Sequence, residues 1–203
     1  MSRAVASALQ YRHVDTGAMY RAVAWLASHD GVDLGDEAAV AAIATRADLD
    51  LTQGVIIDGH DVTTAIRTAD MDGAAARVSR HPSVRAALVA RQREYGRHGG
   101  IVMEGRDIGT VVFPDADVKL YLDASAEERA RRRAADPSHT ASQSGGSVQG
   151  VAQALEARDR SDRTRAASPL TQAPDAIYID TTGLAVSDTV EKVLGLVKAA
   201  MAR

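Results

Sequence analysis

The sequence predicts an α/β domain in which a parallel sheet carries helices on both faces. Two observations lead to this fold class: short apolar segments typical of strands recur along the chain, and each is followed by a stretch with helical character. Strands that alternate with helices favour a parallel sheet covered on both sides. A chain of 203 residues is long enough for one such domain with a small inserted subdomain.

The first elements in chain order are three helices and one strand. Ser2–Leu9 has the character of a helix end, and Arg12–Asp15 is a short strand that leads into Thr16-Gly17. Residues 18–28 resume helical character, and Gly31 is expected to end that helix. Another alanine-rich helix is predicted over residues 37–46.

A small β excursion follows, and it is the one candidate for a subdomain. Between Asp48 and Val62, apolar residues alternate with Asp, Gly, Thr and His, and Asp58-Gly59 is typical of a tight hairpin turn. Two helices are then expected, over residues 66–80 and 83–96. Pro82 stands where the second begins, in the first turn that tolerates proline.

The second half of the chain repeats the strand and helix alternation. Strands are predicted over residues 100–104, 117–122 and 176–180. Ser125 and Glu128 have capping-box spacing, so a helix should begin at this point. Further helices are expected over residues 151–165 and 187–200, the latter with Val190, Leu194 and Val197 on one face, whereas residues 136–150 have the composition of a loop.

The composition argues against several classes of protein. There are no cysteines, which excludes disulfides and cysteine metal sites and is compatible with a reducing cytoplasm. The net charge of −3 gives no bulk attraction to nucleic acid or membranes. No apolar run approaches the roughly 20 residues of a membrane span, and the N-terminal residues lack the apolar core of a signal peptide. We therefore expect a cytoplasmic protein with neither a nucleic-acid nor a membrane partner.

Polar side chains follow three of the predicted strands. Ligands of parallel α/β sheets bind at the carboxyl ends of strands, where this chain has Asp15-Thr16-Gly17, Gly105-Arg106-Asp107 and Asp123-Ala124-Ser125. Asp15 or Thr16 could equally cap the following helix. Arg106 and Asp107 stand near two glycines, a setting that suits ligand contact better than packing.

Arginines account for 21 of the 24 basic residues, and two groups of them share a helix face. Arg158, Asp162 and Arg165 have i, i+4, i+7 spacing, and Arg129, Arg132 and Arg133 have i, i+3, i+4 spacing. Such faces can grip phosphate. The alternative is a solvated face with Asp–Arg pairs worth about 0.2–0.5 kcal/mol each. Clustered arginines repel one another unless anions or acidic side chains lie between them.

Three segments together give the sequence a family resemblance. They occur in the order DTGAMYR (Asp15–Arg21), GRDIGTVVFPDA (Gly105–Ala116) and RDRSDRTR (Arg158–Arg165), with Ser168-Pro169-Leu170 after them. In this order and over nearly its whole length, the chain resembles the bacterial cytidylate (CMP/dCMP) kinase family. The segment from Gly105 to Ala116 is long and specific, and with the other two it makes a chance match very improbable.

The resemblance implies a fold, a reaction and its small-molecule partners. The fold would be a P-loop NTP-hydrolase-like parallel sheet of the nucleoside-monophosphate-kinase type, in one domain over residues 1–203. A monophosphate-binding insert would span about 48–97, and a lid about 129–160. The enzyme would transfer the γ-phosphoryl group of ATP to CMP or dCMP with Mg²⁺, and we expect a monomer.

The resemblance also implies roles for particular residues. Contacts to CMP would come from Thr16, Arg21, Arg91, Arg106, Asp107, Arg158, Asp162 and Arg165. Arg129, Arg132 and Arg133 would be catalytic lid arginines that close on the ATP phosphates. Asp15 is a candidate Mg²⁺ contact through water. No strong base is needed, because the CMP phosphate is already a nucleophile.

The sequence departs from the family in one respect. Family members begin with a strand and a Gly-x-x-x-x-Gly-Lys-[Ser/Thr] loop that cradles phosphates, and the 203 residues contain no such motif. We therefore expect a sheet that lacks its first strand and a chain with little or no activity. A shortened gene product and a natural loss of activity both explain this. A non-catalytic protein that keeps the CMP site, and a different small-molecule kinase of the same fold class, are the alternative functions.

Overall fold

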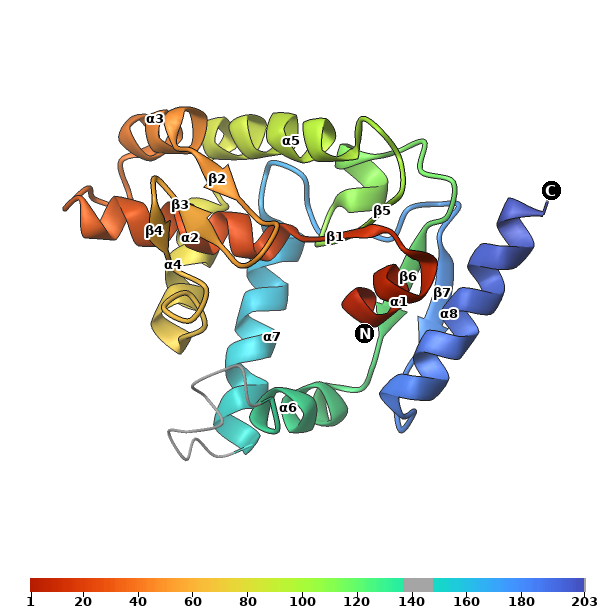
Figure 1. The fold of residues 1–203 in the computed structure, drawn as a ribbon. Coiled ribbons are helices and arrows are strands. Elements are labelled where there is room, and N and C mark those ends of the chain that lie inside the picture. The colour runs from red at the N-terminus through yellow and green to blue at the C-terminus, as the bar shows by residue number, and fades with distance from the viewer. Residues whose placement is uncertain (137–147, 203) are drawn as a thin grey trace.

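The structure of the chain, a computed structural model, describes residues 1–136 and 148–202. Helices and strands alternate along it as expected (Figure 1), which confirms the α/β class. The first half begins with α1 (Ser2–Leu9), β1 (Arg12–Asp15), α2 (Thr16–His29) and α3 (Glu37–Arg46). Within the described ranges, no helix combines the length and the hydrophobicity that crossing a bilayer requires.

The parallel strands form two separate pairs. β1 pairs with β5 (Ile101–Glu104), and β6 (Leu120–Asp123) pairs with β7 (Ile177–Asp180). Each pairing is parallel, so a long crossover must join the two partners. Among the described residues, β5 and β6 each have a strand on one side only. Each of these two strands therefore presents an open edge within the described part of the chain.

Apolar contacts from α1 and α8 (Val186–Met201) connect the two strand pairs. Val5, Ile179 and Val193 form a buried cluster, and Val102 of β5 and Leu120 of β6 both pack against it. The predicted apolar face of the last helix is confirmed, because Val190, Leu194 and Val197 also pack on this cluster. The two pairs therefore share one covered face, although they do not share hydrogen bonds.

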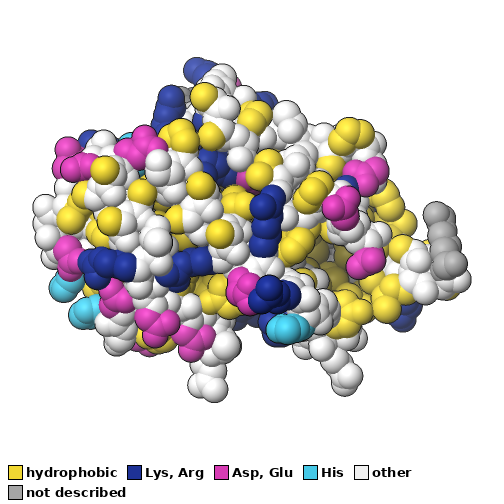
Figure 2. All heavy atoms as spheres, turned by 90° about the horizontal axis from the view of Figure 1, so that it is seen from above, with side chains coloured by type: hydrophobic (Ala, Val, Ile, Leu, Met, Phe, Trp, Pro, Cys, Tyr) yellow, Lys and Arg dark blue, Asp and Glu magenta, His cyan; other side chains and the backbone are white. Residues whose placement is uncertain are grey.

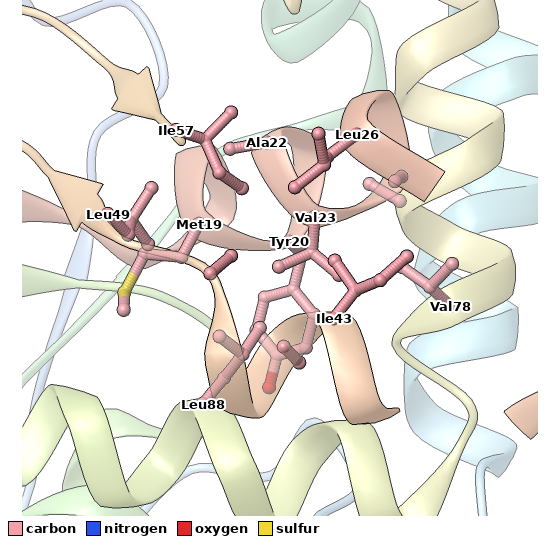
Figure 3. Close-up of a cluster of buried hydrophobic side chains, with 14 of the residues drawn as sticks. Met19, Tyr20, Ala22, Val23, Leu26, Ile43, Leu49, Ile57, Val78 and Leu88 are labelled. Carbon is pink, nitrogen blue, oxygen red and sulfur yellow. The ribbon is translucent and has the colours of Figure 1, made fainter. Parts of the chain in front are cut away.

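The larger core surrounds α2. Met19, Val23 and Leu26 are almost completely buried, and side chains from α3, the small sheet and the later helices pack on them (Figure 3). A helix that is apolar on nearly every side belongs in the middle of a protein. Because α2 begins directly after β1, this packing holds the end of β1 rigidly in place.

The expected β excursion is a three-stranded antiparallel sheet of very short strands. They are β2 (Leu49–Asp50), β3 (Ile56–Ile57) and β4 (His60–Asp61). Asp58 and Gly59 have φ values of 45° and 81°, which confirms the hairpin turn, since such turns need positive φ at both central residues. The helices that follow are α4 (Ala69–Val78) and α5 (Pro82–Gly96), with Pro82 in the first turn of α5 as predicted.

Two helices connect β6 to β7. These are α6 (Ala126–Ala134) and α7 (Val148–Thr164), so α7 begins before the predicted start at 151. Residues 137–147 of the expected loop lie outside the described residues. The Ser125 hydroxyl caps α6 as expected, at 3.2 Å from the Glu128 amide. The reciprocal half of the capping box is not made, because the Ser125 amide donates to Thr182 Oγ1 instead.

Candidate functional site

A large cavity lies beside the carboxyl ends of β1 and β5. Its volume is about 1470 Å³, and it is bordered by the open edges of β5 and β6 and by side chains of α2, α5 and α7. Figure 2 shows a hollow bordered by hydrophobic side chains on one face of the molecule. The edge residues make one part of the cavity apolar, whereas arginines and aspartates from the helices and strand ends line the other part.

The end of β1 holds the start of α2 through Asp15 and Thr16. Asp15 accepts from the Ala18 amide at 3.1 Å, so the capping interpretation holds for this residue. The other carboxylate oxygen pairs with Arg21 at 2.9 Å and Arg67 at 3.3 Å. Burial alone would raise the pKa of Asp15, but the two guanidinium charges outweigh it and lower the pKa below its usual value. Asp15 is therefore ionised at neutral pH.

Thr16 connects the ends of two neighbouring strands. It is buried, and its hydroxyl donates to the carbonyl oxygen of Glu104 at 2.8 Å. A side chain at Gly105 would meet this hydroxyl, because an added Cβ would lie 2.4 Å from Thr16 Oγ1. Glycine at 105 therefore permits the close approach of the two strand ends. A π-helical turn over Ile108–Val112, which the sequence did not predict, follows immediately.

Arg106 and Asp107 follow β5, and their side chains form ion pairs with different helices. Arg106 lies 3.1 Å from Asp159 and 3.2 Å from Asp162, both on α7. Those two carboxylate oxygens have no hydrogen-bond partner among the described residues, so each contact is an ion pair without hydrogen-bond geometry. Asp107 is buried and pairs with the buried Arg85 of α5. The strand end thereby connects α5 with α7.

The charged segment of α7 has one buried face and one solvated face. Asp159, Asp162 and Arg165 are each no more than 6% exposed. In contrast, the pair Glu156–Arg160 on the same helix is exposed. The interpretation as a fully solvated charged face therefore does not hold on the cavity side.

Arg165 is fixed at the C-terminal end of α7. It donates to the Ser168 carbonyl oxygen at 2.7 Å and to Asp162 at 3.2 Å. Ser168 has a positive φ of 50°. The Leu170 amide donates a hydrogen bond to the Asp162 carbonyl oxygen at 2.8 Å. Burial lowers the pKa of Arg165, and the nearby charge of Arg85 lowers it further. An anion placed between these two arginines would relieve their repulsion.

Several buried donors around the cavity lack partners among the described residues. They are Tyr20 Oη, Arg21 Nε, Arg85 Nε, Arg129 Nε and Arg165 Nη2, and all five residues line the cavity. Buried donors in native proteins are usually satisfied, so the group indicates a ligand rich in acceptors. Burial also raises the pKa of Tyr20 to about 12, which keeps its hydroxyl a donor. The chemistry of the cavity thus suits an anion.

Comparison with known proteins agrees with this chemistry. The family model described as cytidylate kinase matches residues 1–199. The chain belongs to the cytidylate kinase family. The resemblance indicated by its three segments is confirmed, and the family consists of nucleoside monophosphate kinases, which are phosphotransferases.

Similar proteins come from several bacteria. The cytidylate kinase of Solibacter usitatus (strain Ellin6076) is 45% identical over 199 residues, which cover 98% of this chain and 86% of that relative. The cytidylate kinase of Limosilactobacillus fermentum (strain NBRC 3956 / LMG 18251) is 42% identical over 98% of this chain and 89% of its own length. The cytidylate kinase of Geobacillus kaustophilus (strain HTA426) is 42% identical, and the match covers 97% of this chain and 89% of that relative.

Most residues assigned to CMP by the family resemblance are brought together, but Arg91 is not. Thr16, Arg21, Arg106, Asp107, Arg158, Asp162 and Arg165 all line the cavity. Arg91 is absent from the cavity wall and donates to the Thr45 carbonyl oxygen of α3 at 2.7 Å. Six residues along a helix correspond to about 600° of rotation, so Arg85 and Arg91 face different directions.

The three lid arginines of the family resemblance lie in different surroundings. Arg129 lines the cavity and pairs with Asp159. Arg133 pairs with Asp72 of α4. Arg132 instead donates to Thr181 and to the Leu184 carbonyl oxygen, which attaches α6 to the end of β7.

Sequence reasoning missed Arg85, Asp72 and Asp159. Arg85 stands on the same arginine-rich helix as Arg91, and its partner Asp107 is 22 residues away in sequence. Asp159 could have been found, because it lies one turn before Asp162 on the face that carries Arg165. Asp72 gave no sequence signal, since its arginine partners come from other parts of the chain.

Proposed function

We propose that the cavity binds CMP or dCMP as the acceptor of the γ-phosphoryl group of ATP. The observation that carries this proposal is the convergence of Arg21, Arg106, Arg158 and Arg165 on one cavity in a chain of the cytidylate kinase family. Arginine forks bind phosphate oxygens in two places, and the unpartnered donors would supply further contacts. The product would be CDP or dCDP.

Each group of residues has a defined task in this proposal. Arg21, Arg158 and Arg165 hold the acceptor phosphate, with Arg85 in the place that the family resemblance gave to Arg91. Asp162 accepts from the sugar hydroxyls, and Thr16, Arg106 and Asp107 shape the base side of the site. Arg129 and Arg133 face the transferred phosphoryl group, whereas Arg132 positions α6.

The residues of this chain act by alignment and by charge. Phosphoryl transfer requires two phosphates to be brought into line, with their repulsion cancelled and water excluded. Converging guanidinium groups lower the repulsion, and buried side chains around them exclude water. The acceptor phosphate needs no activating base, which agrees with a site that is built from arginines and hydrogen-bonding groups.

The described residues do not by themselves form a Mg²⁺ site. No group of three acidic or histidine side chains among them could hold a metal ion. Both carboxylate oxygens of Asp15 already accept hydrogen bonds, from the Ala18 amide and from Arg21 and Arg67. Mg²⁺ is commonly held by substrate phosphates and few carboxylates, so the ion would accompany ATP. No step of the proposal depends on its position.

We also propose that the 203-residue chain transfers phosphate very weakly, because its sequence has no phosphate-cradling loop for ATP. A coupled assay of CDP formation tests this, with UMP, AMP and shikimate as comparison acceptors. A normal rate with CMP from these residues would contradict the proposal. CMP binding without transfer is the outcome expected of the alternative, a non-catalytic nucleotide-binding protein.

The decisive experiment is CMP binding by calorimetry, on the parent chain and on Arg158→Ala. We expect micromolar affinity that is lost on substitution, because Arg158 lies at the cavity with a partly exposed guanidinium. Circular dichroism of both proteins shows whether they are folded. A folded parent that does not bind CMP would overturn the proposed site.

A further inference from the structure

Asp159 contacts two arginines that belong to different parts of the cavity. Its Oδ1 lies 3.1 Å from Arg106 Nη2, and its Oδ2 accepts a hydrogen bond from Arg129 Nη1. Asp159 belongs to α7, whereas Arg106 follows β5 and Arg129 stands on α6. All three side chains line the cavity. One carboxylate therefore lies between an arginine assigned above to the base side and an arginine assigned to the transferred phosphoryl group.

Asp159 is buried, whereas the two arginines that it contacts are partly exposed. The residue is 5% exposed, but the side chains of Arg106 and Arg129 are 36% and 32% exposed. A long arginine side chain loses much rotamer freedom when it is held in one place. A short carboxylate that is enclosed by its surroundings is a suitable fixed point for two such side chains.

The contact with Arg106 leaves the N–H groups of this arginine available to a ligand. Asp159 Oδ1 has no hydrogen-bond partner among the described residues, and the same is true of Asp162 Oδ2, which lies 3.2 Å from Arg106 Nε. Attraction between opposite charges does not require hydrogen-bond geometry. The two acids thus keep the guanidinium group at the cavity by charge, without using its donors.

Stability alone is a poor explanation of Asp159. Apolar side chains of similar volume often stabilise a buried site as well as an ion pair does. Glu156, three residues earlier on α7, makes an ion pair with Arg160 of the same helix, and both side chains are exposed. What distinguishes Asp159 from Glu156 is its contact with arginines from two other elements, both of them at the cavity.

We propose that Asp159 is a positioning residue that holds Arg106 for the base side of the nucleotide and connects this side to α6 through Arg129. A nucleotide that binds Arg106 restricts the motion of this side chain. Because Asp159 contacts both arginines, and because α6 packs along α7 (Figure 1), the restriction extends to α6. The inference rests on the proposed function, since it uses the same two arginines.

Calorimetry of CMP binding tests the contact with Arg106. Asp159→Asn removes the charge that holds Arg106, so we expect CMP to bind about tenfold more weakly, a change of about 1.4 kcal/mol. Glu156→Gln is the matched control, because it removes one negative charge from an exposed pair on the same helix, and it should leave CMP affinity unchanged. Inorganic phosphate should bind both variants as it binds the parent, since Asp159 contacts none of the arginines assigned to the acceptor phosphate.

A double-mutant cycle separates positioning from a general structural role. If Asp159 acts through Arg106, Asp159→Asn should weaken CMP binding in the parent but should add no further loss to Arg106→Gln. A residue that only supported the fold would lower the affinity by the same factor in both backgrounds, and that result would overturn the inference. Circular dichroism shows which of the variants are folded.

Hydrogen exchange tests the connection to α6. CMP should slow the exchange of α6 amides in the parent and in Glu156→Gln, because the bound nucleotide restricts Arg106. Arg129→Gln removes the contact between Asp159 and α6 but leaves Arg106 in place. This variant should bind CMP with a smaller change in α6, and it provides the test even where Asp159→Asn does not fold. An equal slowing in the parent and in Arg129→Gln would contradict the inference.

The outcomes distinguish this inference from the proposed function. If the folded parent does not bind CMP, the proposed function fails and the inference fails with it. If the parent binds CMP and Asp159→Asn binds it equally well, the inference alone fails.

Discussion

At the scale of single residues, the charged groups around the cavity hold one another in place. Arg85 with Asp107 and Arg129 with Asp159 are pairs in which the acid is buried and its partner comes from a distant part of the sequence. Breaking a buried pair by removing one partner costs about 3–5 kcal/mol, because the other charge is left uncompensated. Binding and stability are therefore coupled at these positions.

Arg85 and Arg91 allow a direct comparison on one helix. We expect Arg85→Lys to weaken CMP binding about tenfold, because lysine keeps the charge beside Asp107 but loses the planar fork. Arg91→Lys should leave CMP affinity unchanged, since Arg91 contacts α3 instead of the cavity. Calorimetry with CMP decides between them, and an equal loss in both variants would contradict this assignment.

Asp15 should contribute to the pH dependence of stability. Its pKa in the folded chain is lowered by Arg21 and Arg67 despite burial, from an unfolded value of about 3.9. Its contribution is therefore present above about pH 4 and is lost as the pH falls through the folded pKa. Asp15→Asn keeps a good helix cap but removes the charge. We expect this variant to be less stable at pH 7 and to lose less stability on acidification.

Urea denaturation at a series of pH values measures this difference. The two stability curves should approach each other as the pH falls below 4, because the protonated Asp15 no longer attracts the arginines. Parallel curves for the parent and Asp15→Asn over that range would show that the pairing with Arg21 and Arg67 does not lower the pKa of Asp15.

Residue placement could be predicted from the sequence where the signal is local. The strand-end groups Asp15-Thr16 and Arg106-Asp107 were found because a parallel sheet gathers strand ends at one edge. The directions in which Arg85 and Arg91 point could not be predicted in this way. Both arginines lie on one helix, and which of them faces the cavity depends on how α5 packs against the turn that follows β5, a contact between residues far apart in sequence.

At the scale of elements, capping residues, turn residues and a first-turn proline mark where several helices and strands begin or end. Pro82 begins α5, Asp58 and Gly59 form the hairpin, and Ser125 begins α6, as these residue types predict. The π-helical turn after β5 has no such signal, because it depends on tertiary contacts around Gly105 and Val112. Elements with a cap or a turn residue were predictable, and this turn was not.

The Ser125 cap offers a test of α6. Ser125→Ala removes the acceptor of the Glu128 amide, so we expect a loss of about 1 kcal/mol in the free energy of unfolding. Ser187→Ala is a matched control, because Ser187 is exposed in the first turn of α8 and donates to the neighbouring Asp188 without capping the helix. Thermal denaturation compares the two, and equal effects would show that the cap contributes nothing.

At the scale of the whole molecule, the division of the parallel strands creates the cavity. The edges of β5 and β6 that pair with no other described strand border it, and Val102 and Leu120 from these strands reach the cluster under α1 and α8. Backbone N–H and C=O groups at such edges can pair with another strand, and exposed apolar side chains there readily contact other apolar surfaces. The parallel strands could be predicted from the sequence, but the size of the space beside them depends on packing that no local pattern encodes.

The apolar part of the cavity should bind a hydrophobic dye. We expect the folded chain to enhance the fluorescence of anilinonaphthalene sulfonate at neutral pH while its near-ultraviolet circular dichroism stays that of a packed protein. Leu122→Glu, at the open edge of β6, should reduce this signal, because Leu122 lines the cavity and the added carboxylate would repel the sulfonate of the dye. Tyr178→Glu changes a more exposed side chain of β7 outside the cavity and should leave it unchanged. Equal reductions would place the dye elsewhere.

The burial of α2 has a consequence for how the chain exchanges its amide hydrogens. This helix carries Arg21 in its second turn, and nearly all of its residues from Ala18 to Ala27 are buried (Figure 3). Its amides can reach solvent only when the surrounding core opens, so their exchange reports the slowest and most global opening. A ligand held by Arg21 therefore slows exchange along the buried turns of the helix, including those that lie far from the ligand itself.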